Sequence, residues 1–525
     1  MADTNLINTD PRTGGPVLQG VPLHEEYGVY YHRWQFLQRS YSGGAQYRLG
    51  NYLTKYVMEN NNEYLQRIAQ TPLDNHCKSI IHIYNSFLFR NSPKRYFGNL
   101  EGTPELEQFL KDADLEGRSF DSFMRDVNVQ SSIYGHCLLL LDKPSVNLGT
   151  RAQELEEGIR PYVSLFTPEN ILDWEFKRLP SGYYELSFLR LFEREQRAFG
   201  LETQYYIRTF TKEKIYLERY NQHKTKALEV VEEIDNTLGM IPAIFVYAQR
   251  SPVRGIGVSD IGDIADMQNS IYNELSEIEQ TIRLSGHPSL VKTIDTEANA
   301  GAGAIINMSN DLDPGLRPSL LQPSGQSIDM ILNSIENKVK AIDRMAHMGS
   351  VRAIESRSMS GIALQTEMLQ LDTKLIEKSK NLELAEEQIF RLFGRWMGEA
   401  WDGEIKYPSI FNIRDRNYEM ELLKKASDCN PADPLVKRTI DKKILETIIN
   451  DEDDLEELKE EEAEHPVTTT ADRSAHIQQM IMDGYTDQQI LQIHSEISQA
   501  DIDAAKQQLL NSNNEAASTS QTPAS

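Results

Sequence analysis

Cysteine is almost absent from this chain of 525 residues, which has only Cys77, Cys137 and Cys429. Three scattered cysteines are too few for a disulfide framework, so we expect synthesis in a reducing cytosol. Long apolar runs are also missing, because purely apolar segments such as Cys137–Leu141 are far shorter than the roughly 20 residues of a membrane helix. Neither a secretion signal nor a membrane span is expected.

Positive charge is in short supply. The chain has 54 Lys and Arg against 79 Asp and Glu, which gives a formal net charge of -25. A protein that binds nucleic acid over a broad surface needs many Lys and Arg to neutralise phosphates. The composition therefore argues against a general nucleic-acid binder and allows only local or weak contact with nucleic acid. The length exceeds a single hydrophobic core, so about three packed regions are expected.

Recognisable catalytic motifs are lacking as well. No G-x-x-x-x-G-K-[ST] is present, which disfavours a P-loop ATPase. The run Gly255–Gly262 fails as a dinucleotide loop, because Asp260 stands where the third glycine would fall. It is better explained as a flexible strand-to-helix turn. We expect no catalytic residue, no cofactor and no metal site. Two pairs of neighbouring carboxylates are expected on wet helix faces: Asp263 with Asp266, and Glu386 with Glu387.

Three segments with helical periodicity are the strongest positive signal. Val258–Leu284 has an apolar residue every three or four positions over roughly 27 residues, or about 40 Å of helix. Ile328–His347 repeats this rhythm. Leu364–Trp396 keeps a 4,3 alternation over roughly 50 Å, interrupted only by Lys378. A helix of that length requires a partner along its whole face.

The segments on either side of the second helix are of a different kind. Ser285–Ser327 is rich in glycine and proline around short apolar pieces, which predicts a small strand-containing subdomain at the tip of a helical hairpin. Gly349–Gly361 is short, small and polar, and Ser360 is available as an N-cap for the third long helix.

The part of the chain before these helices predicts an α+β fold. Tyrosines between His24 and Asn60 alternate with Arg and Lys, which suits either a base-stacking surface or helix packing with wet hydroxyls. Packing is favoured because no RNA-binding signature accompanies them. Antiparallel strands are expected at 137–142, 162–166, 171–176, 183–192, 204–210, 214–220, 227–234 and 241–247, with short pieces after Trp396 rejoining that sheet.

Four segments, taken in their order along the chain, resemble a portal protein of tailed double-stranded DNA bacteriophages. They are Tyr134-Gly135 running into Leu138–Asp142, the strand turn Ser164–Trp174, Ile241–Tyr247 leading through Gly257–Ile261, and Ser360–Leu364. Each motif is weak alone, and the order carries the resemblance.

The resemblance implies a structural ring, usually dodecameric, at one capsid vertex, with the channel used for genome packaging and ejection. The implied partners are sister copies, the major capsid protein, terminase, head-tail adaptor proteins and double-stranded DNA read without sequence preference. The implied location is the virion, after assembly in the host cytoplasm. A net-negative protein suits such a conduit, because a tunnel that attracted phosphates strongly would hold the DNA instead of letting it pass.

The resemblance also implies a portal-type fold that is mainly helical, and it divides the chain into parts. The expected parts are an extended N-terminal arm (1–23), a wing of helices and antiparallel sheet (24–255), a stem helix (256–284), a clip (285–327), a second stem helix (328–348), a tunnel loop (349–361), a long tunnel-flanking helix (362–398), wing return strands (399–420), a helical crown (421–510) and a disordered tail (511–525).

Candidate functional residues follow from that map. We expect transient DNA contact at Arg352 and Arg357 with small neighbours, although both arginines could instead pair with Glu355, Asp343 or a neighbouring subunit. The full set is Ser350, Arg352, Ser356, Arg357 and Ser358 in the tunnel loop, His287, Lys292 and Arg317 at the clip interface, and Ile271, Leu275, Leu371 and Leu375 in subunit packing.

Two other functions stay open from the sequence. The chain could be a coiled-coil scaffold or tail structural protein that uses Leu364–Trp396 as a dimer seam. It could also be an enzyme, such as a nuclease, with magnesium held by Asp263 and Asp266.

Overall fold

The computed structural model describes residues 8–9, 16–17, 21–144, 153–154, 157–195, 204–220, 228–286, 289–291, 313, 319–321, 326–348, 361–409, 411, 423–426, 477–478, 481, 499, 502–503 and 505–507. The chain divides into two compact units, Met1–Asn412 and Ile413–Ser525. In the second unit, Ile477, Ile502 and Ala505 form a small buried cluster. Most of the expected crown and the whole expected tail lie outside the described residues. The elements below belong to the first unit.

Its first half supplies six α-helices: α1 (Glu25–Ser42), α2 (Gly44–Leu49), α3 (Asn61–Gln70), α4 (His76–Leu88), α5 (Pro104–Lys111) and α6 (Phe120–Tyr134). Their ends follow local chemistry. The Asn60 side chain accepts from the Glu63 N–H in a capping box that starts α3, and Ser119 caps α6. Gly135, with φ of 91°, ends α6 in the left-handed region.

The aromatic residues of α1 and α2 pack inward. Tyr27, Trp34 and Tyr47 are each buried, with ring contacts between Tyr27 and Trp34 and between Tyr47 and Tyr272. The Tyr47 hydroxyl still donates to Asn269 of a long helix. For these residues the structure agrees with helix packing, the favoured interpretation of this tyrosine-rich segment, because rings covered by their own chain cannot stack on bases.

Most of the β structure lies in two antiparallel sheets, where the sequence suggested one, and the other described strands form two-stranded pairs. A three-stranded sheet has the order β11-β4-β5, from Ala243–Tyr247, His136–Asp142 and Tyr162–Phe166. A five-stranded sheet has the order β10-β9-β8-β7-β6, from Leu228–Asp235, Lys214–Tyr220, Gln204–Thr211, Tyr184–Glu195 and Ile171–Arg178. The strands themselves start and end close to their expected positions. Hydrophobic alternation predicts a strand but not its partner, which is why the split was missed.

In the part of the chain after Trp396 that the structure describes, no strand rejoins either sheet. Strand β14 (Glu404–Lys406) instead pairs antiparallel with β3 (Lys94–Tyr96), a strand that the sequence did not indicate. Three residues of Lys-Arg-Tyr carry no apolar alternation, so only tertiary pairing identifies β3 as a strand. The expected return of residues 399–420 to the sheet is therefore wrong for the described part of that segment.

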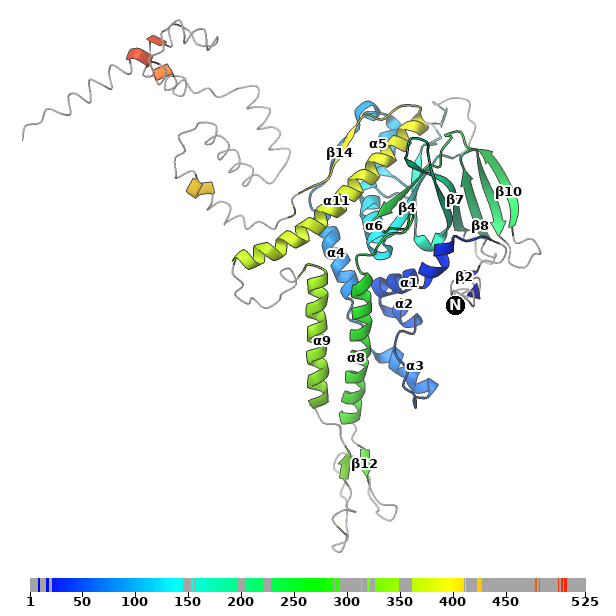
Figure 1. Cartoon of the computed structure of the whole chain (residues 1–525), viewed down its shortest axis with the longest axis vertical. Helices are drawn as coiled ribbons and strands as arrows, with labels where there is room; N and C mark the ends of the chain where they lie inside the picture. Colours follow the sequence, from blue (N-terminus) through cyan, green and yellow to red (C-terminus); the bar gives the residue numbers. More distant parts are fainter. Residues whose placement is uncertain are drawn as a thin grey trace, which may run out of the picture. The chain divides into compact units, whose positions relative to one another are not determined.

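Three long helices complete the unit: α8 (Gly262–Gly286), α9 (Gln326–Met345) and α11 (Gly361–Met397). Helices α8 and α9 form a hairpin, and an antiparallel pair of short strands, β12 (Ser289–Val291) and β13 (Ser319–Leu321), lies beyond its far end (Figure 1). Helix α11 crosses the body beside α4, β4 and β11. The fold is α+β with antiparallel sheets, as expected.

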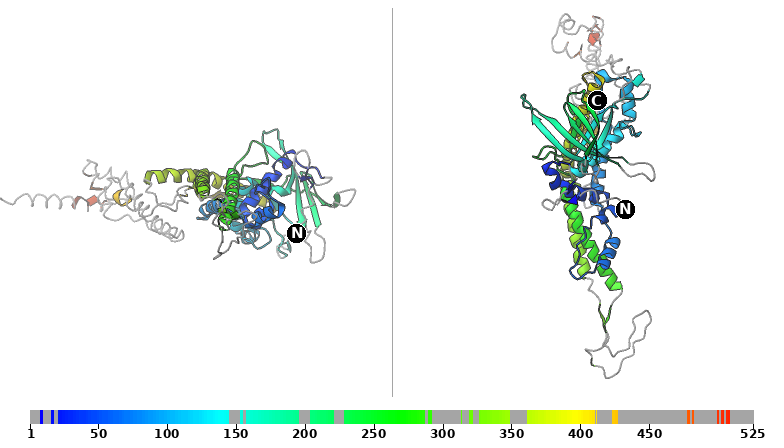
Figure 2. Two further views of the ribbon diagram at one scale, coloured as in Figure 1. Left: turned by 90° about the horizontal axis from the view of Figure 1, so that it is seen from below. Right: turned by 90° about the vertical axis from the view of Figure 1, so that its right-hand side faces the viewer.

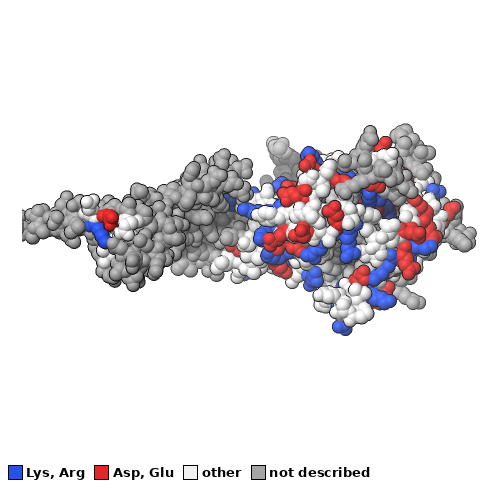
Figure 3. Space-filling view, turned by 90° about the horizontal axis from the view of Figure 1, so that it is seen from above, with Lys and Arg blue, Asp and Glu red and all other residues white. Residues whose placement is uncertain are grey.

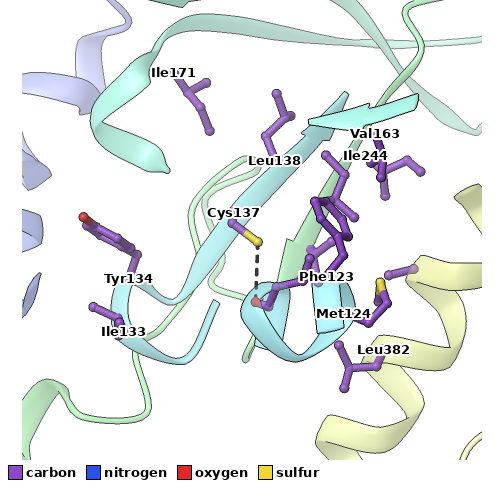
Figure 4. Packing of buried hydrophobic residues seen from close by; sticks show 14 of the residues in the cluster. Phe123, Met124, Ile133, Tyr134, Cys137, Leu138, Val163, Ile171, Ile244 and Leu382 are labelled. Carbon is purple, nitrogen blue, oxygen red and sulfur yellow. Dashed lines mark hydrogen bonds between the residues drawn. The ribbon is translucent and has the colours of Figure 1, made fainter. Parts of the chain in front are cut away.

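The main hydrophobic core lies where α6, the three-stranded sheet and α11 meet. Figure 4 shows Phe123 and Met124 of α6 between Val163 and Ile244 of the sheet and Leu382 of α11. The inner stripe of α11 is thus covered by its own chain.

Candidate functional site at the base of the helical hairpin

Two of the sequence segments that carry the resemblance, Tyr134–Gly135 and Gly257–Ile261, come together at the base of the α8–α9 hairpin. The end of α6 approaches the turn before α8 so closely that a Cβ on Gly135 would stand 2.5 Å from the Gly257 carbonyl oxygen. A Cβ on Gly257 would stand 2.0 Å from the Gly135 oxygen. Only two glycines allow the backbones to meet in this way.

Hydrogen bonds join the same two segments. The Asp260 N–H donates to the Ser132 carbonyl at 3.0 Å. The Ser259 hydroxyl donates to the Ile133 carbonyl at 2.6 Å. Both acceptors belong to the last turn of α6, where carbonyls have no partner within the helix. The turn before α8 therefore acts as a C-terminal cap for α6, and for this reason α8 begins at Gly262 instead of Val258.

A buried ion cluster attaches α11 to this place. The Lys378 ammonium lies 2.5 Å from one Asp260 oxygen, and the Lys374 ammonium lies 3.0 Å from the other. The Asp260 and Lys378 side chains are only 1% and 2% exposed. Lys378 also donates to the Ser132 hydroxyl at 2.8 Å. Lys378, which interrupts the apolar stripe of α11, thus forms a specific buried ion pair. We call Ser132, Gly135, Gly257, Asp260 and Lys378 the joint.

The surroundings shift the pKa of two groups, Asp260 in the joint and His136 beside it. Burial alone would raise the pKa of Asp260, but Lys378 and Lys374 outweigh it and hold that pKa below its usual range. Burial lowers the pKa of His136 to about 3. Its Nδ1 accepts a hydrogen bond from the Gly257 N–H at 3.2 Å, a role that requires the neutral ring. Asp260 is therefore ionised and His136 neutral near pH 7.

A second buried ion cluster fixes the other half of α11. Glu386 is fully buried and accepts from Arg95 of β3 at 2.7 and 2.9 Å, while Arg95 also binds Asp121. The Tyr407 hydroxyl donates to Glu386. The expectation of a wet face is wrong for Glu386, because its charge is balanced by a guanidinium from a distant strand. Its neighbour Glu387 pairs with Arg391 near the surface.

Helix α8 is held on both sides. On one side, Arg33 of α1 binds both oxygens of Asp266 on α8, at 2.6 and 2.8 Å. On the other, Glu274 of α8 binds Ser334 and Lys338 of α9. Asp266 is exposed, as expected of a wet face, but its charge is already paired.

The end of α9 is anchored as well. The Tyr84 hydroxyl of α4 donates to the Ala346 carbonyl at 2.8 Å, and Ala346 and Met348 are buried. The expected tunnel loop starts at the next residue and ends where α11 begins. Its candidates Ser350, Arg352, Ser356, Arg357 and Ser358 lie outside the described residues. The clip candidates His287, Lys292 and Arg317 also lie outside them.

The four residues expected in subunit packing are described, and they require a correction. Ile271, Leu371 and Leu375 are buried in the core of their own chain, and Leu275 packs half-buried against it. Their apolar area is therefore covered without a second copy. The periodicity correctly identified an apolar face, but it could not tell an intrachain partner from an interchain one.

The surface chemistry of the described part is mixed. On the face shown in Figure 3, Lys and Arg are interspersed with Asp and Glu over the described residues and do not form a broad positive surface. Within that same part of the chain, no three His, Cys, Asp or Glu side chains are grouped to hold a metal ion. None of the helices in it combines the length and apolar character that crossing a bilayer requires.

The sequence shows Lys378 as an interruption of the apolar stripe of α11 but does not show what its ammonium binds. The usable signal was a lysine inside an otherwise apolar stripe, since a buried charge requires a partner. Its partner Asp260 lies 118 residues away, and no pattern in the sequence connects the two.

The chain was compared with known proteins. No protein-family model matches it, and no curated protein does. Among solved structures it is similar to a chain of the "Virion of native gene transfer agent (GTA) particle", with 10% identity and a TM-score of 0.38, over 68% of this chain and 86% of the other. It is also similar to a chain of the "Neck of empty GTA particle computed with C6 symmetry", with 8% identity and a TM-score of 0.39, over 70% and 89%. At these values the likeness carries no information about function.

Proposed function

We propose that this chain is a structural protein of the head or neck of a phage-like particle, and more specifically its portal subunit. Copies of it would form a ring at the capsid vertex through which DNA is packaged and ejected. The observation that carries the proposal is the hairpin α8–α9, which ends in the strand pair β12–β13 and is fixed at its base to α6 and α11 by the joint.

The parts of the chain receive roles on this proposal. Residues 24–255 with 399–420 would be the wing, 256–284 and 328–348 the stem, and 285–327 the clip that binds terminase and later the adaptor proteins. Residues 349–361 would form the tunnel loop, with Arg352 and Arg357 touching DNA phosphates transiently. The crown would lie within 421–510.

The anchoring around the tunnel loop suits this role. Ala346 at the end of α9 is bound by Tyr84, and Lys378 of α11 is bound by Asp260. A loop between two fixed helices can change its conformation while the helices themselves stay in place. Such an arrangement supports contact with moving DNA without distortion of the ring.

Contacts between sister copies must use other residues than those first expected. The apolar side chains that stay exposed on the long helices include Met330 and Leu332 on α9 and Leu369 and Ile376 on α11. Covering a Leu or Met side chain stabilises by about 1.5–3 kcal/mol. These outward faces, and not the inner stripe of α11, are the surfaces that we assign to the ring.

The coiled-coil alternative is disfavoured by packing. A dimer seam along α11 would need Leu371, Leu375 and Leu382, but all three are buried within the chain. The nuclease alternative loses its proposed ligand, because Asp266 is already bound by Arg33.

Electron microscopy and light scattering of the purified full chain test the proposal. We expect closed rings with an axial opening wide enough for duplex DNA, and a mass that is a fixed multiple of 60.0 kDa. A chain that stays monomeric or dimeric over a wide range of concentration and salt would contradict it. Rings without an axial opening would contradict the channel.

A further inference from the structure

A tight turn between α2 and α3 displays two apolar side chains. The Glu59 N–H donates to the Tyr56 carbonyl at 3.2 Å, so Val57 and Met58 occupy the centre of the turn. They are 99% and 94% exposed, more than any other large apolar side chain among the described residues. Polar residues or glycine usually occupy these positions. We call Val57 and Met58 the knob.

The turn that carries the knob is held by a buried ion pair. Arg67 of α3 donates to both oxygens of Glu59 at 2.8 Å, and each side chain is only 4% exposed. Arg67 also donates to the Ser276 hydroxyl of α8 at 3.1 Å. Burying two charges has a large desolvation penalty, yet here it fixes a turn whose tip touches nothing.

Further bonds attach the flanks of the turn to the same face of α8. The Thr54 N–H donates to Asn273 at 2.8 Å, and the Tyr56 hydroxyl donates to Glu277. The knob therefore stands at a fixed place beside α8. A rigid apolar pair binds a partner with little loss of conformational entropy.

A shallow hollow, wide open to solvent and of about 520 Å³, lies on the seam between α8 and α9, mostly on α9, and is called the groove. Its apolar wall consists of Met267 of α8 with Met330 and Ala341 of α9, and Asn333 and Asn337 supply amide groups. Met330 is 68% exposed, so part of this wall is uncovered. Helices α3 and α9 lie on opposite sides of α8 (Figures 1 and 2).

We propose that the knob of one copy occupies the groove of the next copy. Because the two surfaces lie on opposite sides of α8, the contact is heterologous and repeats from copy to copy, as a ring requires. Exposed side chains of opposite charge stand beside the two surfaces, with Lys55 next to the turn of the knob and Asp329 next to Met330 in the sequence. Lys338, which lines the groove, is already paired with Glu274. The inference rests on the proposed ring and names one contact that closes it.

The contact is an anchor within a larger interface. A stable interface buries about 800 Å² on each partner, which two side chains do not provide alone. Buried apolar anchors nevertheless carry much of the binding energy of an interface. The exposed faces of α9 and α11 would supply the remaining area.

Disulfide trapping tests the contact directly. In a Cys429→Ser background, whose other cysteines, Cys77 and Cys137, are buried, Met58→Cys is combined with Met330→Cys. Mild oxidation should give a ladder of covalent multimers that ends at the ring size. Each single variant, oxidised alone, should give no ladder.

The outcomes separate this inference from the proposed function. Rings that form normally but give no ladder would overturn the knob contact and leave the portal proposal standing. If the parent chain forms no rings and the double-cysteine variant gives no ladder, both fail.

A second test of the contact uses no engineered disulfide. Val57→Ser with Met58→Ser should raise the concentration at half-assembly by on the order of tenfold or more, with unchanged circular dichroism because both side chains are exposed. Val29→Ser, on exposed α1 surface, is the matched control and should leave assembly unchanged. Equal assembly of the knob variant and the control would count against the proposal.

Discussion

The joint and the turn that carries the knob are built in the same way and used differently. Each is held by a buried ion pair, Asp260–Lys378 in the joint and Glu59–Arg67 at the turn. In the joint both charged side chains are covered by the same chain, at the place where α6, the turn before α8 and α11 meet. At the turn the tip projects into solvent. In both cases a buried ion pair fixes the relative orientation of the segments that it joins. This holds in the joint, which is covered, and at the turn, whose tip is exposed.

The largest effect is expected when the joint loses its negative charge. Asp260→Asn leaves the Lys378 ammonium buried without a counter-charge, which should lower the free energy of unfolding by about 3–5 kcal/mol. Urea unfolding followed by tryptophan fluorescence measures this, because all four tryptophans lie in Met1–Asn412. Exposed Asp263→Asn is the control and should change stability by less than about 0.5 kcal/mol.

A backbone change in the joint should also lower stability. Gly257→Ala places a Cβ against the Gly135 carbonyl oxygen, so the segments must separate, and we expect a loss of about 1–3 kcal/mol. In Gly262→Ala the new Cβ meets only the end of Arg33, at 3.9 Å. That control, at the first residue of α8, should be neutral or stabilising. Equal losses in the two variants would contradict the close approach.

Acid should weaken the joint through His136. Its pKa is about 3 in the folded chain because of burial, whereas an unfolded histidine titrates near 6.5. Between these pH values the unfolded chain binds more protons, so stability falls as pH is lowered from 7 toward 4, by up to about 1.4 kcal/mol per pH unit.

His136→Gln tests this assignment, since an amide oxygen can still accept from Gly257. Unfolding free energies at pH 7, 6 and 5 should show a flatter dependence on pH in the variant than in the parent. Parallel dependences would show that His136 does not supply the slope.

The smallest effect on stability is expected at the knob. Val57→Ser with Met58→Ser removes no intrachain packing, so the free energy of unfolding of the separated chain should change by no more than about 0.5 kcal/mol. A measured loss of 2 kcal/mol or so would show that the two side chains pack within the chain, and the contrast with the joint would disappear.

Much of the local structure follows from the sequence. The three long helices begin and end within a few residues of their expected positions, and β5 and β9 match at both ends. Ser119 and Gly135 bound α6 as caps should. Periods of 3.6 and 2 residues and the chemistry of caps are properties of neighbouring residues, so a linear sequence contains them.

Pairing over long distances does not follow from it. The division into two sheets, the pairing of β14 with β3, and the burial of Glu386 depend on partners far along the chain. The assignment of Leu371 and Leu375 to subunit packing failed for the same reason. An apolar stripe predicts that a helix face will be covered. Only the fold shows whether the covering residues come from the same chain or from another copy.

By itself, the sequence determined which segments become helices and strands, that the protein is α+β, and that its charge is unsuited to broad binding of nucleic acid. The tertiary structure decided that Asp260 and Lys378 meet, that Gly135 and Gly257 touch, and that Val57 and Met58 stay exposed. Local elements follow from neighbouring residues, whereas burial and ion pairing follow from which distant surfaces come together, and that is a property of the whole packed chain.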